Sequence, residues 1–163
     1  MNQWIILKRC HYSNFIPCIK RWYDGIEFKR RIVFTDSCKY WVDEESCVNK
    51  LFGFSFGLLG VHKNSVRFGW RYNGVSGKIE ILEYYYRSGR LIKNVIGEVR
   101  TGEEMLCSIK SFIRDGKKCV SLYIDNRCIN TIVFEGVKKW LLTLGFYFGG
   151  DSRAPHKMVC LWA

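Results

Sequence analysis

Hydrophobic side chains recur at every second position along most of this chain. From residue 65 to residue 72, Val, Phe, Trp and Tyr hold the even positions, while Ser, Arg, Gly and Arg hold the odd ones. This two-residue period is typical of a β-strand with one face in a core and the other toward solvent or a ligand. The even positions from Trp140 to Phe148 are also apolar, which predicts a strand that buries its even-numbered side chains.

Turn-forming pairs separate the apolar runs. Asn73-Gly74, Ser88-Gly89, Asp115-Gly116 and Asp125-Asn126 all lie between such runs, and these residue types favour the positive φ angles of tight hairpins. The pattern predicts strands at 4–8, 27–34, 39–42, 50–56, 65–72, 78–86, 91–96, 105–113, 118–124, 127–134, 139–148 and 156–162. So many short strands without a long helix predict an all-β sandwich or barrel, and their contrasting faces favour an antiparallel two-sheet sandwich. Residues 1–163 are expected to form a single domain.

Composition and charge limit the classes of protein and of partner to be considered. Hydrophobic residues make up 48% of the chain and aromatic residues 16%, which is typical of an ordered core. The net charge is +11, with 9 basic against 6 acidic residues in 1–50, 8 against 3 in 51–100, and 9 against 6 in 101–163. Because the basic excess is spread along the chain, it indicates a solvated surface, with non-specific polyanion contact as the alternative.

Eight cysteines occur without any Cys-x-x-Cys pair, which argues against structural zinc. Several alternate with apolar strand positions, as Cys107 and Cys160 do, and these are expected to be reduced, buried thiols. The apolar run near Met1 is too short for a signal peptide or a membrane span. We therefore predict synthesis in the cytoplasm and no disulfides. The alternative is a secreted, disulfide-bonded protein.

The order of short motifs in about residues 45–163 is distinctive. It runs through Asn49-Lys-Leu-Phe-Gly-Phe-Ser, the segment from His62 to Tyr72, Lys78-Ile-Glu-Ile, strands joined by Asp-Gly and Asp-Asn turns, and Gly145-Phe-Tyr-Phe-Gly-Gly followed by Ala154-Pro-His. This succession resembles concanavalin-like jelly-roll proteins, of the lectin and glucanase type, from bacteria and their phages. The resemblance implies a jelly-roll sandwich that binds or processes glycans, although the same architecture also hosts virion proteins. No catalytic signature of a lyase or hydrolase subfamily is matched.

An exposed strand face that mixes aromatic and charged side chains is the best candidate for a ligand site. Arg67 and Arg71 alternate on one strand, and Glu80, Tyr84 and Tyr86 alternate on the next, so the turn at 73–77 places them on one face. Aromatic rings stack on sugar rings while planar polar groups bind sugar hydroxyls, which predicts glycan binding there. The alternative is a solvent-facing ladder of Arg–Glu pairs with tyrosines covering their neighbours.

Catalytic and metal chemistry have less support. Glu80 and Glu83 are three positions apart on a strand, so they lie on opposite faces and cannot form the carboxylate pair of a glycosidase. His11, His62 and His156 are far apart in the sequence and predict no metal site. His156 follows the turn at 149–155 and is a candidate ligand-binding residue; the alternative is that it binds backbone groups of that turn.

We predict a non-catalytic, lectin-like interaction or structural module that needs no cofactor. Its expected partners are glycan or other protein subunits, and a phage virion assembled in the cytoplasm would suit both the reduced thiols and the missing signal peptide. A polysaccharide lyase that acts on anionic glycans is an alternative, because the chain offers the Arg, Tyr and His side chains that such an enzyme needs. A basic polyanion-binding protein is a further alternative.

Overall fold

The computed structural model describes residues 1–41, 48–150 and 152–163. These residues form twelve strands and one 3-10 helix, η1 (Asp36–Cys38). The strands are β1 (Asn2–Ile6), β2 (Ile19–Arg21), β3 (Ile26–Phe34), β4 (Asn49–Phe56), β5 (Ser65–Asn73), β6 (Lys78–Arg87), β7 (Arg90–Val99), β8 (Glu104–Arg114), β9 (Lys117–Ile124), β10 (Arg127–Phe134), β11 (Trp140–Leu144) and β12 (Met158–Trp162).

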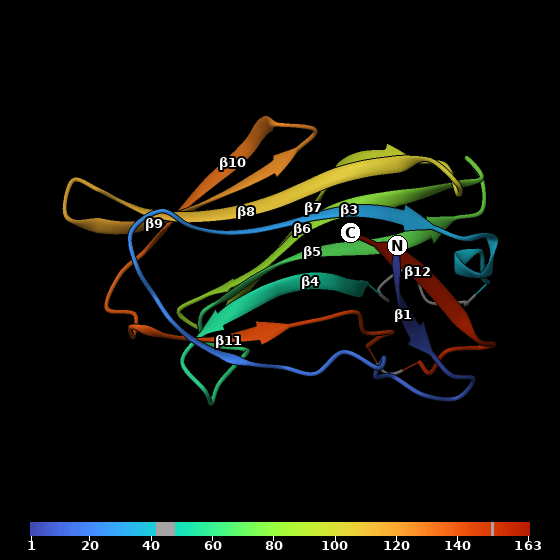
Figure 1. Cartoon of the computed structure of the whole chain (residues 1–163), viewed down its shortest axis with the longest axis horizontal. Helices are drawn as coiled ribbons and strands as arrows, with labels where there is room; N and C mark the ends of the chain where they lie inside the picture. The colour runs from blue at the N-terminus through green and yellow to red at the C-terminus, as the bar shows by residue number, and fades with distance from the viewer. Residues whose placement is uncertain (42–47, 151) are drawn as a thin grey trace.

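The strands form two antiparallel six-stranded sheets (Figure 1). The first sheet has the order β1-β12-β3-β8-β9-β10, and the second has the order β2-β11-β4-β5-β6-β7. The chain therefore passes between the two layers several times, as in a jelly roll. The predicted all-β, two-sheet antiparallel jelly-roll sandwich is confirmed.

The core lies between the two sheets and is rich in aromatic side chains. The even positions of β5 point into it, and Val66, Phe68 and Trp70 are fully buried, as predicted. The indole of Trp70 stacks on the ring of Phe146, with 5.3 Å between the ring centroids. The odd-numbered side chains of β5 consequently point away from the core, and the candidate site lies on that side.

Three two-residue hairpins occur at the predicted turn pairs. Ser88-Gly89 joins β6 to β7, Asp115-Gly116 joins β8 to β9, and Asp125-Asn126 joins β9 to β10; both residues of each pair have positive φ. Positive φ at both positions gives the turn a twist that matches the paired strands. These turns therefore help to set the register of each hairpin.

The predicted strand at 139–148 is shorter than expected, and its predicted burial pattern is partly wrong. β11 ends at residue 144, and within it Leu141 is buried whereas Trp140 is 45% exposed. Even-numbered burial holds only beyond the strand, at residues 146 and 148. The pattern changes phase at Gly145, where the ring of Phe15 lies so close to the backbone that a Cβ would overlap it. The phase change thus coincides with a contact between segments far apart in the sequence.

Two smaller differences also come from tertiary contacts. Residues 39–41 form no strand, and Val42 of the predicted strand at 39–42 lies outside the described residues. β2 was not predicted because all three of its residues are exposed and show no alternation. It forms because it pairs with residues 140–142 of β11.

Glu80 and Glu83 lie on opposite faces of β6, as their spacing predicts. Glu83 points into the sandwich and accepts hydrogen bonds from Nδ2 of Asn94 and Nδ2 of Asn130, each 2.6 Å long. Because Asn94 belongs to β7 and Asn130 to β10, this buried carboxylate links the two sheets. Glu83 therefore stabilises the packing of the two sheets and does not lie on the outer face.

All seven described cysteines are free thiols, so the predicted lack of disulfides is confirmed for them; Cys47 lies outside the described residues. Burial raises the pKa of the Cys38 thiol to about 12, and it also raises the pKa of Cys107 and Cys160. These buried thiols stay protonated at neutral pH and pack as small apolar groups. In the described ranges, no helix has the length and apolar character needed to cross a membrane.

Candidate functional site

A cavity of about 520 Å³ opens on the outer face of the second sheet, over β4, β5 and β6. Its walls come from the N-terminal segment, the loop before β5 and the segment after β11. The lining residues are Tyr12, Ser13, Phe15, Pro17, Lys50, Val61, His62, Arg67, Tyr84, Tyr86, Leu144, Gly145, Phe146, Tyr147 and Gly150. The volume falls in the range of about 300–1,000 Å³ that is common for small-ligand sites.

A bulge in β4 shapes the floor of this cavity. Between Lys50 and Gly53, the β4–β5 register shifts, so that two residues of β4 face one residue of β5. Both of those residues, Leu51 and Phe52, are buried in the core. Lys50 and Gly53 are an odd number of positions apart, and the bulge allows both to lie on the outer face.

Arg67 occupies the centre of the floor. Its partners across the two ladders are Gly53 on β4 and Tyr84 on β6. A Cβ at Gly53 would overlap the carbonyl oxygen of Val66 and would lie 2.8 Å from Cγ of Arg67, so only glycine leaves room for the arginine stem. Arg67 is 8% exposed, and its Nε has no hydrogen-bond partner in the described part of the chain.

Aromatic rings surround the two cations of the floor. Cζ of Arg67 lies 5.2 Å from the ring centroid of Tyr84. Nζ of Lys50 lies 5.0 Å from the same centroid and 5.4 Å from that of Tyr147. Tyr86 and His62 extend the aromatic surface, with 5.0 Å between their ring centroids. Ring faces attract positive charge, so they hold these cations in place without neutralising them.

Burial determines the protonation states at the floor. Burial raises the pKa of Tyr84, and the hydrogen bond with Tyr86 raises it further, so the phenol stays protonated at neutral pH. Burial lowers the pKa of Arg67, which stays charged because the usual value for arginine is above about 12. None of the described residues that line the cavity is Asp or Glu. The floor is therefore positively charged and rich in hydroxyl groups.

Three of the six predicted site residues meet in this cavity. Arg67 lies directly opposite Tyr84, and Tyr86 follows on the same face of β6. All three line the cavity. The hairpin register, which the turn at 73–77 closes, accounts for this arrangement.

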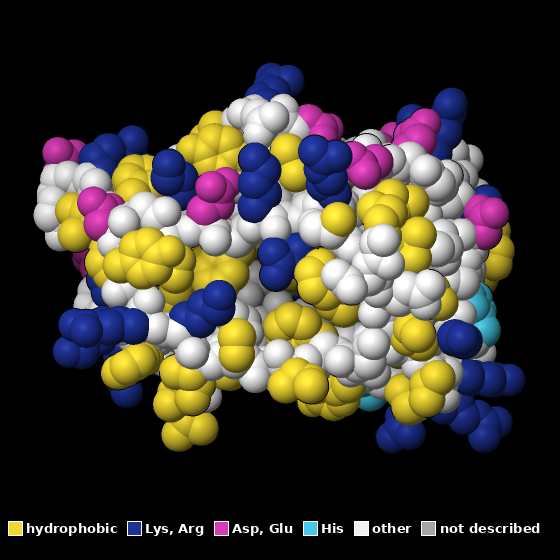
Figure 2. Space-filling model, viewed as in Figure 1, with side chains coloured by type: hydrophobic (Ala, Val, Ile, Leu, Met, Phe, Trp, Pro, Cys, Tyr) yellow, Lys and Arg dark blue, Asp and Glu magenta, His cyan; other side chains and the backbone are white. Residues whose placement is uncertain are grey.

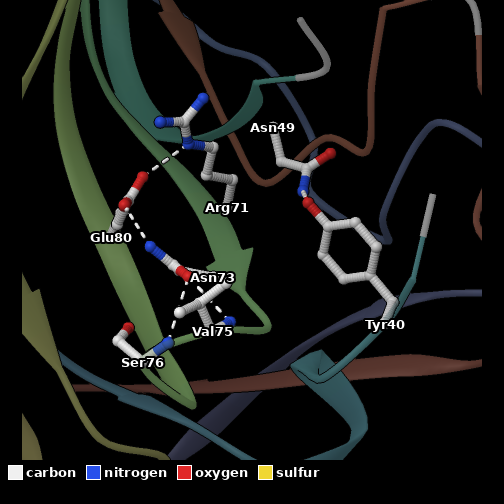
Figure 3. Close-up of polar contacts among 7 residues, drawn as sticks. All are labelled: Tyr40, Asn49, Arg71, Asn73, Val75, Ser76 and Glu80. Atoms are coloured by element: carbon white, nitrogen blue, oxygen red, sulfur yellow. Dashed lines mark hydrogen bonds and ion pairs between the residues drawn. The ribbon is translucent and has the colours of Figure 1, made fainter. Parts of the chain in front are cut away.

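Arg71 and Glu80 lie further along the same two strands, beyond the cavity lining, and form an ion pair (Figure 3). Nδ2 of Asn73 donates a second hydrogen bond to Glu80 at 2.7 Å. Oδ1 of Asn73 accepts from the backbone N–H groups of Val75 and Ser76, as Figure 3 also shows. This network stabilises the turn end of the β5–β6 hairpin.

His156 lies away from the cavity. Its Nε2 donates a hydrogen bond of 2.7 Å to the backbone carbonyl of Ser37, and Oγ of Ser37 accepts from the backbone N–H of Val159. These bonds hold the segment before β12 against η1. Within the described ranges, no group of three or more His, Cys, Asp or Glu side chains is placed to hold a metal ion.

The lining residues that were not predicted include Tyr12, Lys50, His62 and Tyr147. Tyr147 could have been predicted from the sequence, because the expected alternation puts odd-numbered side chains on the outer face, and this holds for the residues beyond Gly145. Lys50 could not have been predicted in the same way, because its orientation depends on the bulge that follows it. Tyr12 and His62 lie outside the regular strands. Tyr12 pairs with Tyr147 through an isolated β-bridge, which no local sequence pattern predicts.

The sequence matches no protein-family model and no curated protein. Among solved structures, the chain is similar to a functionally unknown protein from Saccharomyces cerevisiae, with 11% identity, a TM-score of 0.51, and coverage of 97% of this chain and 80% of that one. It is also similar to galectin LEC-6 of Caenorhabditis elegans (7% identity, TM-score 0.48, coverage 93% and 94%) and to carbohydrate-binding module CBM66 of Bacillus subtilis (11%, 0.36, 90% and 78%).

At 11% identity, the likeness to the yeast protein shows the fold alone. The two antiparallel sheets define the chain as a jelly-roll β-sandwich. Its expected origin in bacteria or their phages stays a prediction.

Proposed function

We propose that this chain is a non-catalytic carbohydrate-binding module and that the cavity on the second sheet is its glycan site. The observation that carries the proposal is the composition of the cavity, where four tyrosines surround the buried cations Lys50 and Arg67. Tyrosine rings offer flat apolar faces to a pyranose ring, and their hydroxyls offer hydrogen bonds to its substituents. A saccharide needs both kinds of contact at once.

The protonation state of the floor favours binding over catalysis. A lyase needs a base, and the raised pKa of Tyr84 keeps its phenol protonated at neutral pH. A glycosidase needs two carboxylates, whereas no described lining residue carries one. The lyase nevertheless remains the alternative to be tested.

A glycan array probed with the intact protein tests the proposal. We expect retention of at least one saccharide class, and Tyr12→Ala and Tyr147→Ala each to weaken that binding about tenfold, which corresponds to about 1.4 kcal/mol. Tyr23→Ala is the matched control, because Tyr23 is an exposed tyrosine outside the cavity lining. An array without any retained glycan, or equal losses in all three variants, would contradict the proposal.

The lyase alternative has its own readout. Incubation with uronic-acid polymers would release unsaturated products that absorb ultraviolet light. Product formation that disappears in Tyr84→Phe would assign catalysis to the cavity and replace the binding proposal.

Two broader predictions stay proposals. The basic side chains in Figure 2 are scattered over the visible face, with acidic side chains among those along the top, so a polyanion would meet no single basic stripe. Polyanion binding by the surface would therefore be non-specific and would fall steeply with salt. A role as a virion component predicts that the chain is found in purified phage particles by mass spectrometry.

A further inference from the structure

Arg67 and Arg71 provide a comparison inside one strand. Both point to the outer face of β5, and each lies opposite a residue of β6. Arg71 faces Glu80 and forms an ion pair with it, whereas Arg67 faces Tyr84. The same strand pair thus supplies a carboxylate to the arginine outside the cavity and none to the arginine inside it.

Arg67 is also the more deeply buried of the two. It is 8% exposed, and the described residues offer it neither an ion pair nor a hydrogen bond to Nε. A buried charge without a partner is unfavourable, so side chains of this kind are normally paired. Gly53, which makes room for the arginine stem, and Tyr84, which contacts the guanidinium, keep it in this position.

The surroundings of Arg67 are suited to a negatively charged group. Lys50 contributes a second, nearly buried cation that lies over the same Tyr84 ring. The guanidinium of Arg67 presents planar N–H groups that match the oxygen pairs of a carboxylate or a sulfate. Because the Arg67 side chain is buried, such a contact is stronger than it would be at the surface.

We infer that the cavity selects an acidic saccharide and that Arg67 binds its carboxylate or sulfate group. This inference rests on the proposed glycan binding and names its ligand class. The tyrosines hold the sugar ring, and the anionic substituent supplies the partner that Arg67 lacks among the described residues. Neutral saccharides would leave the guanidinium unpaired, so they are disfavoured.

Calorimetric titration of the intact protein with matched ligands tests this inference. Oligogalacturonate is compared with its methyl ester, which keeps the rings but removes the carboxylate charges, and 3′-sulfolactose is compared with lactose. We expect the acidic member of at least one pair to bind about tenfold tighter or more. The two pairs also distinguish a carboxylate from a sulfate.

Two variants assign the preference to the cavity. Arg67→Met is expected to remove the preference for the acidic member. Arg90→Met removes the same charge from an exposed residue at the β6–β7 hairpin and should leave the preference unchanged. Thermal unfolding checks that both variants are folded, and the acidic ligand should raise the Tm of the wild type by more than that of Arg67→Met.

The possible results separate the inference from the function on which it rests. Retention of neutral glycans alone, or an acidic preference that persists in Arg67→Met, would overturn the inference and leave carbohydrate binding in place. A lack of binding to every glycan would overturn both. Binding of AMP without any acidic sugar would assign the cavity to nucleotides and would also overturn the inference.

Discussion

Replacing Arg67 with methionine should stabilise the free protein, whereas the same replacement at Arg71 should destabilise it. Methionine is apolar and unbranched, so it can occupy the volume of an arginine stem. At Arg67 it removes a buried charge that has no anionic partner in the described structure. At Arg71 it leaves the nearly buried carboxylate of Glu80 without its cation.

The sizes of these effects follow from the surroundings of each side chain. An unpaired buried polar group costs about 1–3 kcal/mol. The cation–π interaction between Arg67 and Tyr84, worth about 0.5–2 kcal/mol, is largely replaced by a methionine–aromatic interaction of about 0.3–1.5 kcal/mol. We therefore expect Arg67→Met to raise the free energy of unfolding by about 1–2 kcal/mol. At this chain length each kcal/mol corresponds to about 2–4 °C in Tm.

The expected loss of stability at Arg71 is smaller than that for a fully buried pair. Breaking a buried ion pair costs about 3–5 kcal/mol, but the Arg71 side chain is 34% exposed, so water screens part of the interaction. Glu80 also keeps its hydrogen bond from Asn73. We expect Arg71→Met to lower the free energy of unfolding by about 1–2 kcal/mol.

Urea denaturation followed by tryptophan fluorescence measures both variants, because Trp70 is fully buried and reports on the core. Equal slopes against urea would show that the folded and unfolded states expose similar surface in each variant. A decrease of about 1 kcal/mol or more in the free energy of unfolding of Arg67→Met, comparable to that in Arg71→Met, would refute the conclusion that the Arg67 charge is uncompensated.

Three further predictions concern the floor, the hairpin and the thiols. Gly53→Ala should lower the free energy of unfolding by about 1–3 kcal/mol in urea, because a Cβ would overlap the carbonyl oxygen of Val66. Burial alone would raise the pKa of Glu80, but hydrogen bonds from Arg71 and Asn73 lower it below the usual 4.5, so its contribution to stability is present above about pH 4.5 and is lost on acidification. Wild type should therefore lose more stability than Glu80→Gln between about pH 5 and pH 3; equal losses would contradict this. Iodoacetamide should label native Cys10, Cys18 and Cys128, and peptide mapping should show Cys38, Cys107, Cys119 and Cys160 labelled only after unfolding.

The strands and their turns were accessible to sequence reasoning because they are local. Alternation along β5 separates the buried Trp70 from the outward Arg67 without reference to any other part of the chain. Turn pairs such as Asp115-Gly116 set the register of a hairpin within a few residues. The same local logic placed Arg67 and Tyr84 on one face, and in the structure they lie opposite each other on the cavity floor.

Contacts between segments far apart in the sequence could not be predicted from local patterns. The ring of Phe15 lies against Gly145, where the burial pattern changes phase, and the bridge between Tyr12 and Tyr147 brings the N-terminal segment to the cavity. The bulge after Lys50 turns a strand lysine onto the floor. Alternation contains no information about which distant segment will pack against a strand, so the cavity and its second cation could be found only in the folded chain.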